Sequence, residues 1–314
     1  MIHTAQHATD HDTANLVESL SVMIEQESSS TYSCHDYLAG SRHDHHVECR
    51  ADNEITPDDR KKIVDWCYEI VDRCQFQRET VAVAMNIVDR YMCAQARGYH
   101  RGRYQLVAVT SLYMSIKVNE PTAFGIHDFA VMSHGTYSAK DIKDTEWSIL
   151  KDLSWRVCPP TSLQMGHHIL ALMQSKIREN NTDSLQRGTW EFVREEIAFA
   201  VENSVREYYF VTQRPSTVAI AAILNVIEQV GDHDYKLLIL SLLPILQDFD
   251  FEPSFVLKKA MDKLLCMTNS EDHEALEESC GNKEDNREDN ALRNSSLGSF
   301  HGSCTDIACT HNFS

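Results

Sequence analysis

Five His-Asp dipeptides are the residues of this sequence that come nearest to a catalytic metal site. They begin at His11, His35, His43, His127 and His233. Helical metal-dependent phosphohydrolases contain such pairs, and their bound ions activate water for attack on a phosphoester. That chemistry needs further His and Asp ligands from other helices, whereas these dipeptides lie mostly in a polar terminal region or at starts of predicted helices. Because a two-residue motif is also nearly uninformative, we predict no enzyme and no catalytic residues.

The polar N-terminal region holds a second candidate metal site. His35, His43, His45 and His46 cluster within residues 1–54, a segment rich in His, Asp, Ser and Thr. They have neither a cysteine partner nor the regular helical spacing that builds a defined site. The ten cysteines of the chain form no C-x-x-C pair, and several fall inside apolar helical patterns. We therefore predict reduced, mostly buried thiols, no bound metal and no cofactor.

Lys117 and Glu146 are charged residues at positions that apolar patterns surround. Lys117 ends the stretch YQLVAVTSLYMSIK, which has almost no polar face and is shorter than the ~20 residues of a membrane span. This predicts a helix buried on nearly all sides, with a cation at its C-terminal rim. Glu146 interrupts a line of apolar residues at helical spacing. Because a carboxylate there is costly unless it is paired, Lys117 is its expected partner. From these residues alone we favour a structural clasp, with external binding as the alternative.

Helices must position these residues, and the apolar periodicity predicts helices along most of the chain. Thr56, Pro57 and two aspartates form a helix-start signal. The expected first-domain helices begin at residue 57 and then span 79–98, 104–117, 126–133 and 138–153. After Pro159-Pro160, the second-domain helices are expected at 163–178, 189–208, 216–230, 234–247 and 253–267. No stretch alternates with period two for long enough to make a sheet. We predict an all-α protein of two tandem five-helix domains, 55–158 and 159–268, that suggest a weak internal duplication.

Length, composition and charge narrow the class of protein. The chain has 314 residues, of which 42% are apolar, enough to supply the cores of two domains. The net charge of −18 argues against a nucleic-acid partner, which would require a basic face. No segment matches a signal peptide or a membrane span, so we expect an intracellular chain with no membrane partner. Residues 1–54 are expected to be flexible, except for an amphipathic helix at 15–26 that docks on the body or on a partner. Residues 269–314 are expected to form a disordered acidic tail.

Four segments on the predicted helices one, two, three and five resemble the cyclin box. They are RKKIVDW (60–66), IVDRYM (87–92), YQLVAVTSLYMSIKVNEP (104–121) and DTEWSILKDLSW (144–155). In the second domain, RPSTVAIAAIL (214–224) is similar to the third helix of the corresponding cyclin domain, particularly in D-type cyclins. The resemblance covers about residues 56–267. The set is specific because order, spacing and placement on helices agree, although each short motif alone would be weak.

The resemblance implies a two-domain cyclin fold and assigns roles to residues within it. Arg60 matches the first-helix arginine that pairs in cyclins with the aspartate of the second helix, here Asp89. That pair is expected to hold the two helices together. Leu106 matches the core leucine of the third helix, and Trp66 matches a retained tryptophan of the first. We expect both to belong to the core of the cyclin box.

The resemblance also implies a partner, a cyclin-dependent protein kinase, which the chain would bind and activate as a regulatory subunit in cell-cycle control. Lys117 and Glu146 match the lysine and glutamate that contact the kinase around its mobile αC helix, which reverses the preference for a purely structural pair. A kinase needs its αC glutamate paired with a lysine, so a partner that binds this arrangement best activates it. Phe124, Ile126 and Phe129 are candidate apolar contacts, with ordinary core positions as the alternative.

Departures from the family pattern concern substrate docking. Many cyclins have an apolar groove on the first helix that takes Arg-x-Leu motifs, but its methionine position is Asp59 here. One acid of the pair that usually follows the lysine is also missing, because the chain has Asn119-Glu120. Substrate or inhibitor proteins therefore remain candidate partners without a defined site. A transcription-related or scaffold protein with the cyclin fold is the alternative function. The family leads us to expect the nucleus and/or the cytoplasm.

Overall fold

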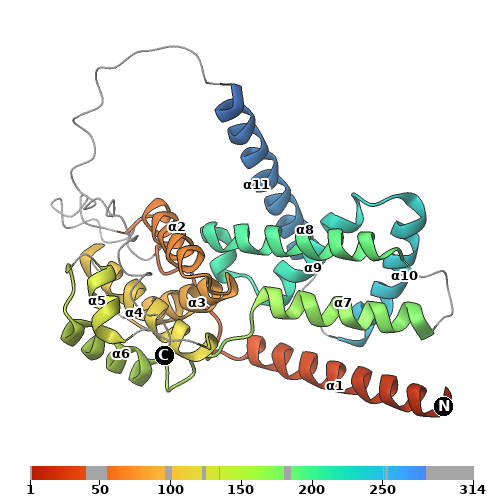
Figure 1. Ribbon diagram of the computed structural model, residues 1–314, viewed down its shortest axis with the longest axis horizontal. Helices are drawn as coiled ribbons and strands as arrows, with labels where there is room; N and C mark the ends of the chain where they lie inside the picture. Colours follow the sequence, from red (N-terminus) through yellow and green to blue (C-terminus); the bar gives the residue numbers. More distant parts are fainter. Residues whose placement is uncertain are drawn as a thin grey trace, which may run out of the picture.

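The computed structural model describes residues 2–39, 55–95, 101–121, 125–133, 135–179, 185–249, 251 and 254–280. Every regular element in these ranges is a helix, so the predicted all-α class is confirmed. The elements are α1 (Ile2–Ser28), α2 (Pro57–Arg73), α3 (Glu79–Ala94), α4 (Arg101–Asn119), α5 (Ile126–Met132), α6 (Ala139–Asp152), α7 (Ser162–Glu179), α8 (Arg187–Arg206), the 3-10 helix η2 (Tyr208–Thr212), α9 (Pro215–Ile227), α10 (Asp232–Asp248) and α11 (Ser254–Cys280). Figure 1 shows α2 to α6 gathered in one group and α7 to α11 in a second.

Each group of helices has its own apolar core around a central helix. In the first, every residue of α4 from 106 to 116 is buried, and α4 packs on α3 and α6. In the second, α9 is buried along nearly its whole length and packs against α7, α8 and α11. The two cores are separate clusters of side chains. This confirms two tandem five-helix domains, while the exact boundaries 55–158 and 159–268 stay a prediction.

Local capping explains where α2 and α6 begin. Thr56 accepts a hydrogen bond from the Asp59 amide, and the Asp59 carboxylate accepts one from the Thr56 amide. Ser138 and Asp141 form the same reciprocal arrangement at α6. Such capping boxes satisfy amides that have no partner inside the helix. The helix-start signal at Thr56-Pro57 is therefore confirmed.

A buried ion pair joins α2, α3 and the second domain. Arg60 makes two hydrogen bonds to Asp89, Nε to Oδ1 at 3.0 Å and Nη2 to Oδ2 at 2.8 Å. Its Nη1 donates to the carbonyl oxygen of Val205 on α8 at 2.6 Å. Asp89 also accepts a hydrogen bond from the Tyr37 hydroxyl at 2.8 Å. Burial lowers the pKa of Arg60, but Asp89 raises it more, so the net pKa lies above the ordinary value and the guanidinium stays charged.

Tyr68 forms a second connection between the domains. The guanidinium groups of Arg78 and Arg206 lie 4.4 and 4.6 Å from the centre of its ring. The Tyr68 hydroxyl donates to the carbonyl oxygen of Glu202 on α8 at 3.2 Å. Arg78 also pairs with the Glu202 carboxylate at 2.6 Å. Residues of α2, of α8 and of the N-cap of α3 thus share one polar cluster at the domain boundary.

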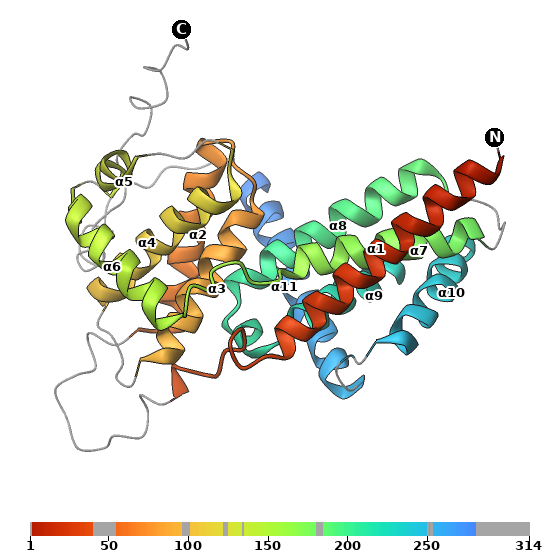
Figure 2. The same cartoon turned by 90° about the horizontal axis from the view of Figure 1, so that it is seen from below.

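Helix α1 packs on the second domain. Leu20 is fully buried in the second core, and Leu16, Met23 and Ile24 pack against it. Buried Glu27 accepts hydrogen bonds from the amide of Ser216, at 2.9 Å, and from its hydroxyl, at the N-terminal end of α9. A carboxylate is favourable there because the helix dipole is positive at this end. Figure 2 shows α1 running alongside α7. Docking on the body is thus the alternative that the structure supports.

Two helices are longer than the sequence pattern predicts. The expected helix at 15–26 extends from Ile2 to Ser28, so much of the region predicted to be flexible is helical. Helix α11 continues to Cys280, whereas the acidic tail was predicted to begin at residue 269. No proline or glycine interrupts α11 before Gly281, and its last turns are rich in glutamate, a good helix former. The rest of the predicted tail, 281–314, lies outside the described residues. Among the described helices, none is long and apolar enough to cross a membrane.

Truncating Leu20 tests whether α1 belongs to the folded body. Because this side chain is fully buried in the second core, Leu20→Ala should lower the free energy of unfolding by about 2–5 kcal/mol in urea denaturation. Val17→Ala is the matched control, since Val17 lies on the same helix and is 42% exposed. Equal losses for the two variants would contradict docking of α1.

Removing Arg60 should leave the Asp89 carboxylate buried without its main counter-charge. We expect Arg60→Ala to lower the free energy of unfolding by about 3–5 kcal/mol. The control Arg187→Ala breaks a pair with Glu191 whose side chains are 92% and 51% exposed, and it should cost less than about 1 kcal/mol. Chemical denaturation measures both, and a similar small cost for Arg60→Ala would show that the buried pair does not hold the domains.

Candidate functional site

Lys117 lies where buried helix α4 reaches the surface. The residues before it, back to Leu106, are all buried, whereas Lys117, Val118 and Asn119 are exposed. The Lys117 ammonium lies 4.9 Å from the centre of the Tyr113 ring, one turn earlier. It also lies in the last turn of α4, where the helix dipole favours a cation. The surroundings therefore hold the ammonium at this rim.

Glu146 on α6 reaches this ammonium. Its Oε1 lies 2.6 Å from the Lys117 Nζ, and the two side chains are 17% and 40% exposed. Ile142 and Ile149, which lie before and after Glu146 on the same side of α6, are fully buried and fix α6 against the first core. The pair is therefore anchored on two rigid helices while its charged groups remain partly open to solvent.

Two tryptophans follow Glu146 on the same side of the domain. Trp147 and Trp155 are each 63% exposed, and their rings meet edge to face with centroids 6.1 Å apart. A shallow hollow on α6 is lined by Lys143, Asp144, Glu146, Trp147 and Leu150. Tryptophan is a common anchor of protein interfaces, because its large ring buries much apolar area on contact. We call Lys117, Glu146, Trp147 and Trp155 the α4–α6 face.

The backbone that presents Trp155 is unusual. Ser154 and Trp155 have φ angles of 50° and 63°, in the left-handed region that non-glycine residues rarely adopt. The Trp155 amide donates to the Leu150 carbonyl oxygen at 2.8 Å, which closes the end of α6. Such backbone strain is concentrated at binding and active sites in proteins. Here it accompanies a large aromatic ring that the chain leaves in solvent.

The apolar contact residues expected from the sequence differ from those the structure exposes. Phe129 is buried beside Tyr113, so it is a core residue, and Ile126 packs partly against the same core. Phe124 lies outside the described residues. Sequence reasoning did not single out Trp147. The sequence could have indicated that Trp147 is exposed, because it directly follows Glu146 and lies outside the apolar stripe of α6 that faces the core.

Asp59 takes part in the fold and does not line an apolar groove. It is buried, caps α2, and accepts a hydrogen bond from Arg101 on α4 at 3.1 Å. Trp66 and Leu106 lie in the first core. Glu120, the retained acid after Lys117, accepts hydrogen bonds from Gln77 and Thr80 at the start of α3. These carboxylates hold helix ends together, which accounts for their positions without a substrate.

The candidate metal ligands of the sequence do not gather into a binding site within the described ranges. Over these ranges no group of three or more His, Cys, Asp or Glu side chains could hold an ion. His35, His127 and His233 are exposed. His43, His45 and His46 lie outside the described residues, and the side chain of His11 does so as well. The thiols also differ from expectation, because of those described only Cys67 is buried.

Comparison with known proteins gives one family match. Residues 20–158 match the family model described as "Cyclin, N-terminal domain". The curated relatives include G2/mitotic-specific cyclin-3 of Saccharomyces cerevisiae, 26% identical over 52% of this chain and 34% of its own length. G2/mitotic-specific cyclin-A1 of Caenorhabditis elegans is 28% identical over 54% of this chain and 32% of its own length. G2/mitotic-specific cyclin-B2 of Rana japonica is 28% identical over 54% of this chain and 39% of its own length. The matches thus span between about a third and two fifths of the length of these relatives. The family match ends at residue 158, so it does not include the second-domain segment that resembles D-type cyclins.

Comparison with solved structures gives two partial matches. A viral cyclin from herpesvirus saimiri has a TM-score of 0.48 and 12% identity, covering 67% of this chain and 87% of its own. The CAK complex from Chaetomium thermophilum bound to ATP-gamma-S contains a chain with a TM-score of 0.42 and 11% identity, covering 88% of this chain and 93% of its own.

The Lys117–Glu146 pair should contribute little to stability, because the Lys117 side chain is 40% exposed and solvent screens it. A double-mutant cycle of Lys117→Ala and Glu146→Ala, measured by urea denaturation, should give a coupling of at most about 1 kcal/mol. A coupling as large as that of a buried ion pair would identify the pair as a structural clasp. The small value would leave its charges available to a partner.

Proposed function

The chain belongs to the cyclin family, and we propose on that premise that it is a regulatory subunit of a cyclin-dependent protein kinase. In this proposal the α4–α6 face binds the kinase, Lys117 and Glu146 supply directional polar contacts, and Trp147 and Trp155 supply apolar area. The chain itself carries out no catalysis. Its proposed setting is the control of cell division, in the nucleus or the cytoplasm, without a nucleic-acid or membrane partner.

The observation that carries the proposal is the combination of charge and exposed aromatic area on a rigid base. An ion pair of 2.6 Å whose lysine is 40% exposed lies beside two tryptophans that are each 63% exposed. Adjacent exposed tryptophans form the kind of apolar surface that tends to mark interaction sites, and the centre of an interface is typically rich in aromatic residues. The curated relatives include proteins named as G2/mitotic-specific cyclins. The exposed aromatic area supports a protein partner on this face, and the names of the relatives support a cyclin-type regulator.

The proposed activation is allosteric. A protein kinase transfers phosphate efficiently only when its β3 lysine pairs with the glutamate of its αC helix. Helices α4 and α6 are fixed by buried side chains on the first core, so the α4–α6 face has little freedom to follow a moving partner. A rigid face that fits the active αC position binds that state more tightly than the inactive one. This difference in affinity shifts the kinase population toward the active state.

The α4–α6 face can be tested by capture of a kinase from extract with the full-length chain. The full chain is used because α1 contributes Leu20 and Glu27 to the second domain. We expect wild type to capture a cyclin-dependent kinase and to stimulate phosphorylation of a histone substrate. The double variant Lys117→Ala/Glu146→Ala should lose at least about tenfold in both, since each hydrogen bond to a charged group contributes roughly 1.5–3 kcal/mol.

The matched control is Arg187→Ala/Glu191→Ala, which removes an exposed pair on α8, in the other domain. It should capture and activate the kinase as wild type does, and circular dichroism should show that all variants are folded. Capture that is equal for wild type and the Lys117/Glu146 variant would contradict the assigned face. If folded wild-type protein captures no kinase, the chain would act as a scaffold or transcription-related protein with the cyclin fold.

A further inference from the structure

Residues 29–39 form a connection between α1 on the second domain and α3 in the first, and we call this segment the strap. The Thr31 carbonyl oxygen accepts a hydrogen bond from Arg90 on α3 at 2.9 Å. Near its other end the Leu38 amide donates to the Tyr208 hydroxyl at 3.1 Å. The Tyr37 ring meets the Tyr208 ring edge to face, with centroids 5.4 Å apart. The strap is therefore held by side chains of both domains.

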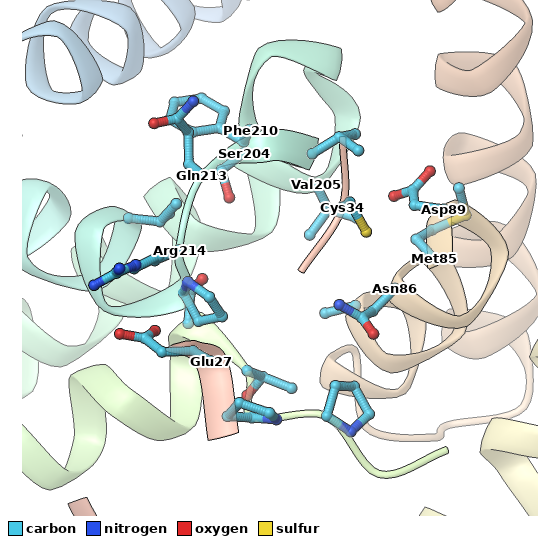
Figure 3. A pocket seen from close by; sticks show the side chains of 18 of the residues that line it. Glu27, Cys34, Met85, Asn86, Asp89, Ser204, Val205, Phe210, Gln213 and Arg214 are labelled. Carbon is cyan, nitrogen blue, oxygen red and sulfur yellow. The ribbon is translucent and has the colours of Figure 1, made fainter. Parts of the chain in front are cut away.

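Two cysteines meet where the strap crosses α3. Cys34 lies in the middle of the strap and Cys93 in the last turn of α3, and the two thiol groups are close enough for each to shift the pKa of the other. The Cys93 thiol also donates to the carbonyl oxygen of His35, the residue after Cys34, at 3.4 Å. Figure 3 shows the Cys34 sulfur on the side of the strap that faces α3. The fold thus brings two thiols from segments 59 positions apart (93 − 34) next to each other.

The two thiols differ in reactivity. The hydrogen bond from Cys34 lowers the pKa of Cys93, which favours its thiolate. The same hydrogen bond, together with burial, raises the pKa of Cys34, which therefore keeps its proton. Since the thiolate is the form that reacts with peroxides, the lowered pKa favours Cys93 as the site of first attack. Cys34 is then the neighbouring thiol that completes the reaction.

A crevice beside the strap reaches Cys34, and Cys93 is itself partly exposed, so a small oxidant can approach the pair. It has about 140 Å³ of space open to water-sized molecules, and Cys34, Met85, Asn86 and Asp89 are among its lining residues. Figure 3 shows these side chains around the crevice, between α3 and the second domain. Both thiols are half-buried and not sealed in a core. Metal binding does not explain the pair, because no cluster of three metal-binding side chains exists within the described residues.

We propose that Cys34 and Cys93 form a peroxide-driven disulfide that fastens the strap to α3. Hydrogen peroxide oxidises the Cys93 thiolate to a sulfenic acid and is reduced to hydroxide. Cys34 sulfur attacks the Cys93 sulfur, the sulfur–sulfur bond forms and the sulfur–oxygen bond breaks. The departing hydroxyl and the hydroxide each take up a proton and leave as water, one proton coming from Cys34 and the other from the original Cys93 thiol. A thiol reductant reverses the step by disulfide exchange.

The consequence of the disulfide is a covalent connection between the domains through α1 and the strap. In the reduced protein, hydrogen bonds and ring contacts hold the strap on α3. The disulfide would restrict local opening of the strap, which otherwise exposes Tyr37 and its hydrogen bond to Asp89. This proposal does not rest on the kinase contact, because neither cysteine lies on the α4–α6 face.

The test treats the reduced full-length chain with hydrogen peroxide, blocks the remaining thiols by alkylation and maps the peptides by mass spectrometry. We expect a peptide containing Cys34 joined to one containing Cys93, with free Cys34 and free Cys93 lost in equal amounts. Dithiothreitol should release both peptides. Hydrogen exchange at residues 29–39 should slow after oxidation of the wild type.

Cys34→Ser and Cys158→Ser are the paired variants. Cys34→Ser should leave Cys93 as a sulfenic or sulfinic acid, with no crosslink and no slowing of exchange. Cys158→Ser removes an exposed thiol and should retain the crosslink. Persistence of alkylatable Cys34 in wild type after Cys93 is oxidised would overturn the proposal, as would reaction of Cys93 no faster than Cys158. Peptide mapping of the wild type decides this even if Cys34→Ser folds poorly.

Discussion

The Arg60–Asp89 ion pair is the constraint on which the arrangement of the two domains depends. A charge buried without a partner is strongly unfavourable, so each group must find its hydrogen bonds inside the protein. Arg60 on α2 donates hydrogen bonds to Asp89 on α3 and to the Val205 carbonyl oxygen on α8. Asp89 also accepts a hydrogen bond from the Tyr37 hydroxyl of the strap. Four segments that are distant in sequence must therefore assemble together before this pair is satisfied.

The same assembly gives the α4–α6 face its rigidity. Helix α3, which carries Asp89, packs along α4, and its Tyr91 hydroxyl hydrogen-bonds to Ser148 on α6 at 2.9 Å. The residues of the α4–α6 face lie at the C-terminal end of α4, on one side of α6 and just after α6. The charged and aromatic side chains of this face thus project from helices that are already packed in the first core. Because these helices need not become ordered on binding, the entropic cost of binding a partner is lower.

The N-terminal region is part of this architecture and not an appendage to it. Glu27 accepts hydrogen bonds from Ser216 at the start of α9, Tyr37 donates a hydrogen bond to Asp89, and Cys34 lies next to Cys93. These contacts join the region to α9 in the second domain and to α3 in the first. The strap consequently couples the second domain to α3, and a chemical change at its two thiols would act on that coupling.

The sequence by itself determined the features that depend on neighbours along the chain. These include the helices, the cap at Thr56, the buried central helix that ends in Lys117 and the line that Glu146 interrupts, because helical periodicity and capping are local. The cost of an unpaired carboxylate indicated Lys117 as the partner of Glu146, and the resemblance to a family added the expectation that both contact a kinase. Only the tertiary structure decided that Phe129 is core while Trp147 and Trp155 are exposed, that Glu27 caps α9 and that Cys34 meets Cys93. These depend on which distant segments pack together, and that choice is made by the side chains of both domains at once.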